Sequence, residues 1–299
     1  MPHPAADRRG LARIAAAGPV VSAVSVQTGA GFGATLLPVI GAPGVVGLRQ
    51  VVAALVLLPA CIRAVRSSDR AILVRASLLG LVLVVMNTTI YFAVERIGLG
   101  LAVTLEFLGP LAVALFSSRR AWDVVCGVAA GLGVVLLTGV VGGIDVVGVA
   151  FALVAGAAWA AYILLGKSLG PRLPGMQSTA LASAVASVVS APFLVVALLA
   201  LSPTQLPHVL LVGLALGVLS SALPYSLDLT VLRLIPRSLF SVLQSVHPAM
   251  AALSGYVILG QTLSVWQIAG LAVISLANAA AVLGSARREA ALRRAALSV

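Results

Sequence analysis

Charged residues are scarce in this chain. Only 9% of its 299 residues are charged, whereas 61% are hydrophobic, and the mean hydropathy is +1.15. A soluble domain could not keep so much apolar surface away from water, so a soluble fold is excluded. The composition therefore predicts an all-α polytopic membrane protein whose surroundings are a lipid bilayer.

Cysteine and recognisable catalytic motifs are also rare or missing. Cys61 and Cys126 lie in or at the edge of apolar runs, with no CxxC spacing and no histidine nearby. Neither a disulfide nor a bound metal ion is expected from them. The sequence also has no P-loop, no HExxH motif, no nucleophile elbow and no Ser/His/Asp set. We therefore expect neither an enzyme nor a cofactor.

The few basic residues follow a topological pattern. A net charge of +11 would suggest a nucleic-acid partner for a soluble protein, but here the basic residues occupy short loops between apolar runs. If the N-terminus is cytoplasmic, 17 of the 19 basic residues fall in inside segments, leaving Arg96 outside and Arg49 within a span. Because this obeys the positive-inside rule, both termini are predicted to be cytoplasmic, and no nucleic acid is expected as a partner.

Ten apolar runs, each of about 20 residues, are long enough to cross a bilayer. They cover residues 15–37, 44–62, 72–94, 97–116, 123–141, 147–166, 179–201, 209–228, 237–259 and 264–284. The first run is too long for the apolar region of a signal peptide, so it is interpreted as a helix. Residues 1–14 and 285–299 are predicted to be short cytoplasmic tails.

The chain repeats itself in two halves. The stretch Ile97–Pro110 aligns with Ile235–Pro248 at a constant offset of 138 residues, which pairs Glu106 with Gln244. Two halves of five spans each must enter the membrane from opposite sides, because five is an odd number. This predicts ten transmembrane helices arranged as two inverted five-helix repeats, an architecture of secondary transporters with the substrate site between the repeats. The predicted repeats are residues 15–141 and 147–284.

Two charged side chains lie inside predicted spans. An ionised carboxylate at the centre of a membrane helix costs roughly 2.5–3.5 kcal/mol, so Glu106 is expected to face a partner or a wet cavity. Arg49 lies at a similar depth from the outer face, so a structural ion pair or a shared cavity would explain both residues. In the functional interpretation, Arg49 meets a carboxylate and Glu106 meets an ammonium group or a proton, which suits a zwitterionic substrate.

Other polar and aromatic side chains in the spans are candidates for the wall of such a cavity. His247 is either a hydrogen-bonded packing residue or a carrier of protons. The remaining wall candidates, each of which could instead serve packing, are Asn87, Tyr91, Trp159, Tyr162, Ser221, Tyr225 and Gln244. Pro110 and Pro248 occupy equivalent places in the two halves and are predicted flex points, because proline removes a backbone donor.

Several of these stretches resemble a known family. They are Gly41-Ala42-Pro43-Gly44 with Leu48-Arg49, Leu105-Glu106-Phe107 with Gly109-Pro110, and Leu223-Pro224-Tyr225-Ser226. They are similar to motifs of the drug/metabolite transporter superfamily, in its ten-span branch with EamA-type repeats, and most of all to the threonine/homoserine exporter group. The chain departs from that family at Gln244 and His247, where the family usually carries an acid before the proline.

The resemblance implies efflux of small amino acids or related metabolites across a bacterial inner membrane, driven by the proton gradient. We therefore predict a secondary active exporter that works by alternating access, with a small-molecule substrate and protons as its partners. The alternative is a broad-specificity carrier or a passive facilitator of the same fold. The small-residue faces suit a homodimer and intramolecular packing equally.

Overall fold

A computed structural model describes residues 4–116, 121–138, 145–169, 173, 176–224, 227 and 243–297, and these residues contain helices and no strand. In chain order the helices are α1 (Pro4–Thr35), α2 (Leu37–Val56), α3 (Leu58–Ser67), α4 (Arg70–Ile97), α5 (Leu99–Glu106), α6 (Leu108–Phe116), α7 (Ala121–Thr138), α8 (Val146–Leu169), α9 (Gln177–Leu199), α10 (Leu206–Gly217), a π-helix (Val218–Ala222), a 3-10 helix (Gln244–Val246), α13 (His247–Leu259) and α14 (Val265–Leu297).

Many of these helices have the length and composition of membrane spans. Five are long and apolar enough to cross a membrane: Leu37–Val56, Arg70–Ile97, Val146–Gly166, Gln177–Leu199 and Val265–Gly284. Three shorter apolar segments are Leu99–Val113, Val124–Leu137 and Leu206–Ser221. Large apolar side chains are exposed along many of the helices, as expected for a surface that faces lipid. The chain is therefore a polytopic membrane protein, as its composition predicts.

The predicted span 97–116 is interrupted at its acidic residue. Helix α5 ends at Glu106 and α6 begins at Leu108. Pro110 has no N–H to donate to the carbonyl of Glu106, which lies four residues earlier. That carbonyl instead lies against Gly156 of α8, where an added Cβ would stand 2.9 Å from its oxygen. Pro110, a predicted flex point, therefore lies next to this interruption.

The described part of the second half is irregular at the corresponding place. The 3-10 helix Gln244–Val246 precedes α13, which starts at His247 with Pro248 in its first turn. Proline suits a first turn because the N–H that it lacks would have no helical partner there. At the offset of 138 residues, Gln244 corresponds to Glu106 and Pro248 to Pro110, so the described backbone of both halves is irregular at equivalent positions.

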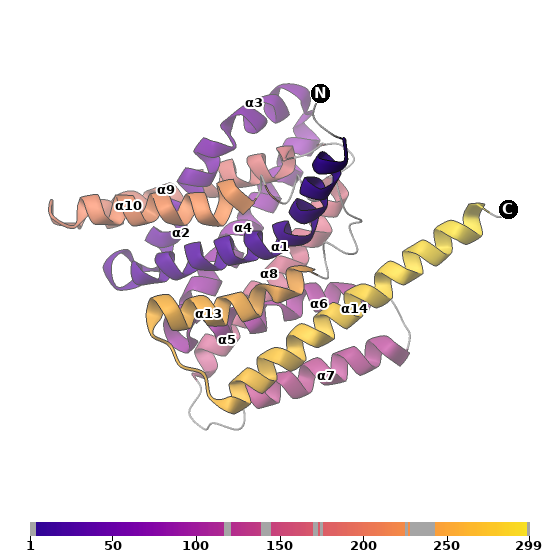
Figure 1. Cartoon of the computed structure of the whole chain (residues 1–299). Helices are drawn as coiled ribbons and strands as arrows, with labels where there is room; N and C mark the ends of the chain where they lie inside the picture. Colours follow the sequence, from indigo (N-terminus) through magenta and orange to yellow (C-terminus); the bar gives the residue numbers. More distant parts are fainter. Residues whose placement is uncertain are drawn as a thin grey trace.

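The helices pack in pairs that join the first half of the chain to the second (Figure 1). Helix α4 packs on α8 and α9, while α1 packs on α13 and α10, and α2 lies along α9. Helix α5 contacts both α8 and α13. The largest cluster of buried apolar residues draws on α2, α4 and α5 and on α8, α10 and α14, including Val45, Leu105, Ala155, Leu216 and Ile274. This core therefore binds the first half of the chain to the second.

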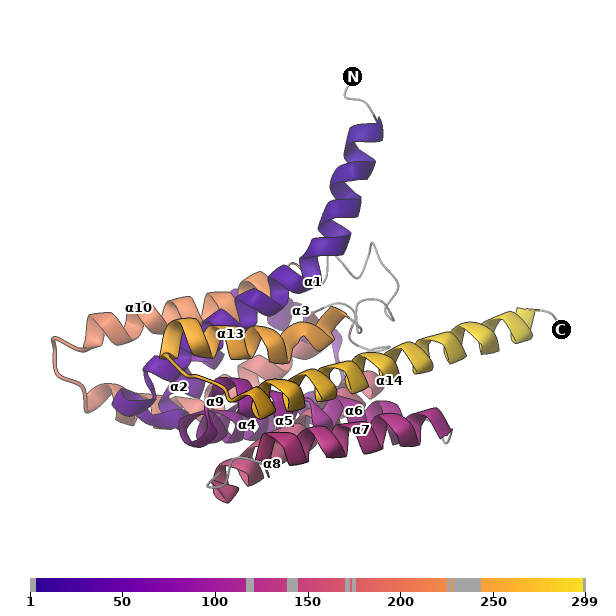
Figure 2. The same cartoon turned by 60° about the horizontal axis from the view of Figure 1, so that its bottom comes forward.

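Two further features set the shape of the bundle. Helices α7 and α14 pack together along one edge, beside α6 and α13 (Figures 1 and 2). Helix α1 begins, and α14 ends, on the side of the bundle opposite the turn that joins α1 to α2 (Figure 1). The two termini thus lie toward the same end of the bundle, which is the arrangement that an even number of spans requires.

Candidate functional site

A cavity of about 150 Å³ lies inside the bundle, between α1, α2, α4, α5, α8 and α13. It is lined by Val26, Gln27, Ala30, Arg49, Met86, Asn87, Ile90, Tyr91, Val94, Leu99, Val103, Glu106, Phe107, Trp159 and His247. This volume has room for several water molecules or for one small ligand. Six of the ten predicted site residues line it, and they come from both halves of the chain.

Arg49 is held in the cavity by a neighbour that is itself anchored. Helix α2 is kinked at Gly41, whose φ of 63° favours glycine, and Arg49 follows two turns later. Its Nη1 donates to Oδ1 of Asn87 at 2.7 Å. The Nδ2 of Asn87 donates to the carbonyl oxygen of Leu83 at 2.8 Å, which fixes the orientation of the amide. The guanidinium is therefore oriented, with donors left over for an anionic group.

Glu106 is buried in the same cavity, with 8% of its surface exposed. Its carboxylate forms no hydrogen bond or ion pair with any other described side chain, and the ion pair found in the described region joins Arg96 to Asp145 instead. The charge that acts on Glu106 is that of Arg49, across the cavity. The structure thus brings Arg49 and Glu106 into a shared cavity rather than into a direct ion pair. A buried carboxylate without a partner is costly, so it calls for a proton or a cationic ligand.

His247 is connected to both halves of the chain. Its Nδ1 lies 3.2 Å from Nε2 of Gln27 on α1, and its Nε2 lies 3.2 Å from Oε1 of Gln244. A neutral imidazole that accepts at Nδ1 and donates from Nε2 satisfies both contacts. This supports the interpretation of His247 as a hydrogen-bonded residue, and it places Gln244 behind the histidine rather than in the cavity wall.

Three rings form one wall of the cavity. Phe107 meets Trp159 of α8 edge to face, with centroids 4.7 Å apart and planes at 88°. On its other side Phe107 stacks on His247, with centroids 5.7 Å apart and planes at 29°. Phe107, the residue between α5 and α6, lies on the same side as Val103 and Glu106, which also line the cavity. The wall therefore connects α8, the break and α13.

Other predicted residues lie elsewhere. Tyr162 packs against a separate apolar cluster that contains Ala64 and Leu169, and Ser221 is buried in the π-helix. Tyr225 lies outside the described residues. Two cavity residues that the sequence analysis missed are Gln27 and Phe107. An amide inside an apolar span is a signal that could have identified Gln27, whereas nothing in the sequence distinguishes Phe107 from a packing residue.

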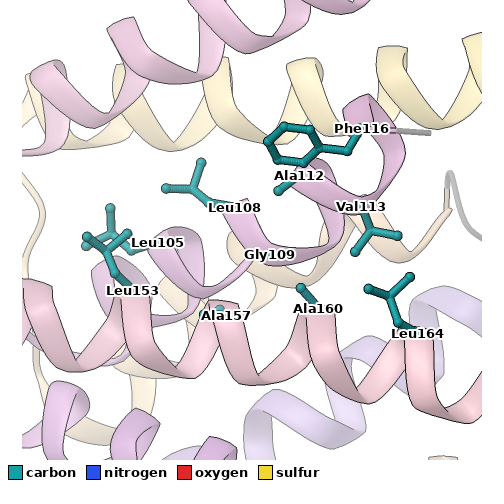
Figure 3. A pocket seen from close by; sticks show the side chains of 11 residues that line it. Leu105, Leu108, Gly109, Ala112, Val113, Phe116, Leu153, Ala157, Ala160 and Leu164 are labelled. Atoms are coloured by element: carbon teal, nitrogen blue, oxygen red, sulfur yellow. The ribbon is translucent and has the colours of Figure 1, made fainter. Parts of the chain in front are cut away.

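A larger groove, of about 570 Å³, lies on the other side of the contact between α6 and α8 (Figure 3). All its lining residues are apolar, and Figure 3 shows Leu105, Leu108 and Val113 on one side of the groove and Leu153 and Leu164 of α8 on the other. Such a groove offers nothing to a charged group. The smaller cavity, with its charged and amide side chains, is the candidate site for a polar substrate.

The cavity is bounded toward the α4–α5 turn by a contact between the two halves. Gln261, in the loop between α13 and α14, accepts a hydrogen bond at Oε1 from the backbone N–H of Leu99, at 2.9 Å. Leu99 lines the cavity and also begins α5, just after Gly98 with its φ of 82°. The N-terminus of α5 is thereby tied to the second half of the chain.

A bundle of membrane-length helices around a cavity that holds charged and amide side chains is the arrangement expected of a membrane transporter. Comparison with known proteins agrees. The chain is 38% identical over 284 residues to the threonine/homoserine exporter RhtA of Salmonella typhimurium, covering 92% of this chain and 93% of that protein. It is 38% identical over 281 residues to RhtA of Escherichia coli strain K12, covering 92% of each.

Residues 146–282 match the EamA-like transporter family. The chain belongs to this family of transporters. A solved crystal structure, described only as that of a protein, has the same fold, with a TM-score of 0.60 and 20% sequence identity. The match covers 92% of this chain and 99% of the other.

Proposed function

We propose that this protein is a secondary active exporter of small amino acids that carry a hydroxyl group, such as threonine and homoserine, or of closely related metabolites. One observation carries the proposal: Arg49 and Glu106 line the same cavity without pairing directly. A guanidinium and a carboxylate so placed are complementary to the two ends of a zwitterion. The names of the related exporters give the substrate class.

The proposed mechanism is alternating access between two inverted five-helix repeats, residues 15–141 and 147–284, in ten spans. Helix packing supports it. If the repeats are superimposed, the packing of α4 on α8 corresponds to that of α1 on α10, and α4 on α9 corresponds to α2 on α10. The stretch that matches the family has nearly the bounds of the second proposed repeat. Equivalent helix breaks at Pro110 and Pro248 would serve as the flex points.

Proton coupling is proposed to use Glu106. The carboxylate has no described partner, so a proton and a substrate ammonium group can compete for it. Binding of one would then favour release of the other, which couples the two fluxes. We propose a bacterial inner membrane with both termini cytoplasmic, because the basic loops obey the positive-inside rule.

The direct test is efflux from cells loaded with a panel of amino acids, comparing wild type, Glu106→Gln and an empty vector. We expect selective efflux of threonine or homoserine by the wild type, lost in the variant and lost when the proton gradient is collapsed. Equal leakage from all three strains would contradict amino-acid export. A flux that is linear in substrate concentration and independent of the gradient would instead identify a passive facilitator.

A further inference from the structure

Gln27 is one of two polar residues of the cavity whose role is not explained by a zwitterion's two charged ends, and Tyr91, whose buried hydroxyl group also has no described hydrogen-bond partner, is the other. Gln27 lies on α1, lines the cavity and is only 4% exposed. Its Nε2 faces His247, but its Oε1 is buried and has no hydrogen-bond partner in the described part of the chain. A buried carbonyl oxygen without a donor is unfavourable, and such exceptions call for an explanation.

The hydrogen bonds of His247 with Gln27 and Gln244 explain why this oxygen has no donor. With Nε2 of His247 donating to Gln244, Nδ1 must accept, and it accepts from the NH₂ group of Gln27. If both glutamine amides were reversed, the ring would still be satisfied, and the NH₂ group of Gln27 would be the unpaired end. In either arrangement one polar end of the Gln27 amide stays without a partner among the residues that the structure describes.

A hydroxyl group suits both arrangements, because it can donate to a carbonyl oxygen and accept from an NH₂ group. The charged ends of a bound amino acid are directed to Arg49 and Glu106, so the side chain is the part left to meet Gln27 in the same small cavity. Threonine and homoserine each carry one side-chain hydroxyl group. A methyl group in its place would leave the glutamine unpaired.

We propose that Gln27 is the recognition site for the side-chain hydroxyl group of the transported amino acid. This inference rests on the proposed function. Gln27 binds the hydroxyl group directly and thereby selects threonine over valine, which has the same shape with a methyl group instead. A residue that only positioned His247 would not act on this selection.

The test compares initial efflux rates of threonine and valine from loaded cells expressing the wild type, Gln27→Leu, Gln244→Leu and Gln50→Leu. Gln244 contacts the other nitrogen of His247 but does not line the cavity, and Gln50 is a buried glutamine of α2 outside it. We expect the wild type to favour threonine by about tenfold to a hundredfold, the range of one satisfied buried hydrogen bond. Gln27→Leu should bring the ratio to within about twofold of unity, while both controls keep it.

A second variant keeps the inference testable if Gln27→Leu does not reach the membrane. Gln27→Asn retains the amide but withdraws it by one methylene, so it should favour homoserine, whose hydroxyl group is one carbon farther out, over threonine. An unchanged threonine-to-valine ratio in Gln27→Leu, or an equal change in Gln244→Leu, would overturn the subsite but leave the exporter intact. Absence of any selective efflux by the wild type would remove both proposals.

Discussion

The two helix breaks lie at equivalent positions in the chain but differ in their chemistry. At the first break, between α5 and α6, the carboxylate of Glu106 faces the cavity without a described partner. At the second, before α13, Gln244 and His247 are neutral groups that satisfy one another. The backbone irregularity is therefore shared by the two halves, while the carboxylate is not.

This difference indicates that the two halves have different roles in transport. A break in a membrane helix needs only a proline and a neighbour that tolerates the freed carbonyl, and both halves have a proline at the break. A buried charge can take part in transport only if its partner can bind and dissociate. In this account the first half carries the charge, and the second half supplies a neutral wall.

The largest expected effect comes from removing the charge at the first break. Glu106→Gln should lower transport by at least about a hundredfold and leave the protein folded, because the amide keeps the shape but neither titrates nor attracts an ammonium group. The measurements are efflux and the amount of monodisperse protein extracted from the membrane.

Moving the acid to the second break sharpens the comparison. In the double variant Glu106→Gln with Gln244→Glu, transport should remain lost, because position 244 lies behind His247 and not in the cavity wall. Recovery of gradient-driven efflux by the double variant would show that the two breaks are interchangeable. That result would contradict different roles for the two halves.

Arg49→Lys should have the next largest effect. Lysine keeps the positive charge but cannot bind Asn87 and a carboxylate with the same planar fork. We expect the half-saturating substrate concentration to rise about tenfold or more, with a smaller change in maximal rate. Arg63→Lys, at an exposed arginine of α3, is the matched control and should behave as the wild type.

The packing of the first break can be disrupted without touching the charge. Gly156 lies against the freed carbonyl of Glu106, and Gly109 meets the backbone of Gly156. Gly156→Val should therefore destabilise the fold by about 1–3 kcal/mol, through overpacking against backbone. Gly131→Val is the control, since nothing lies within 4 Å of an added Cβ there. Thermal unfolding in detergent should show a lower midpoint for the first variant than for the second.

The smallest effect is expected outside the membrane-spanning segments. The hydrogen bond from Arg96, together with those from the backbone N–H groups of Gly148 and Val147, holds the pKa of Asp145 below its ordinary value. A lowered pKa stabilises the fold above the unfolded value of about 3.9, and the gain is lost as the pH falls through the folded value. Asp145→Asn should therefore lower the midpoint slightly at neutral pH, and the difference should vanish in acid.

Much of the fold could be predicted from composition and periodicity, because a bilayer forces long apolar helices and leaves few alternatives. The break at Glu106 was predictable for a similar reason, since the position of Pro110 determines which carbonyl loses its partner. The cost of burying each charge alone predicted that Arg49 and Glu106 would either form an ion pair or share a cavity, and the structure has them in a shared cavity.

The other residues of the site depend on how each helix is rotated about its own axis. When a helix is apolar on all faces, its sequence does not indicate which face is turned to the cavity. Tyr162 faces an apolar cluster while Trp159, three residues earlier on α8, faces the cavity. Phe107 lies at helical spacing from Val103 and Glu106 and lines the same cavity. Its stacking on His247 also depends on how the first half packs on the second, which no local pattern in either half encodes.

The most direct test of the central claim is a measurement of proton movement coupled to substrate flux. Purified protein would be placed in liposomes that contain a pH-sensitive dye, and threonine would be added to the wild type and to Glu106→Gln. The account predicts a change in internal pH with the wild type that follows threonine uptake, and no such change with the variant. An equal pH change with both proteins would contradict the assignment of Glu106 as the coupling residue.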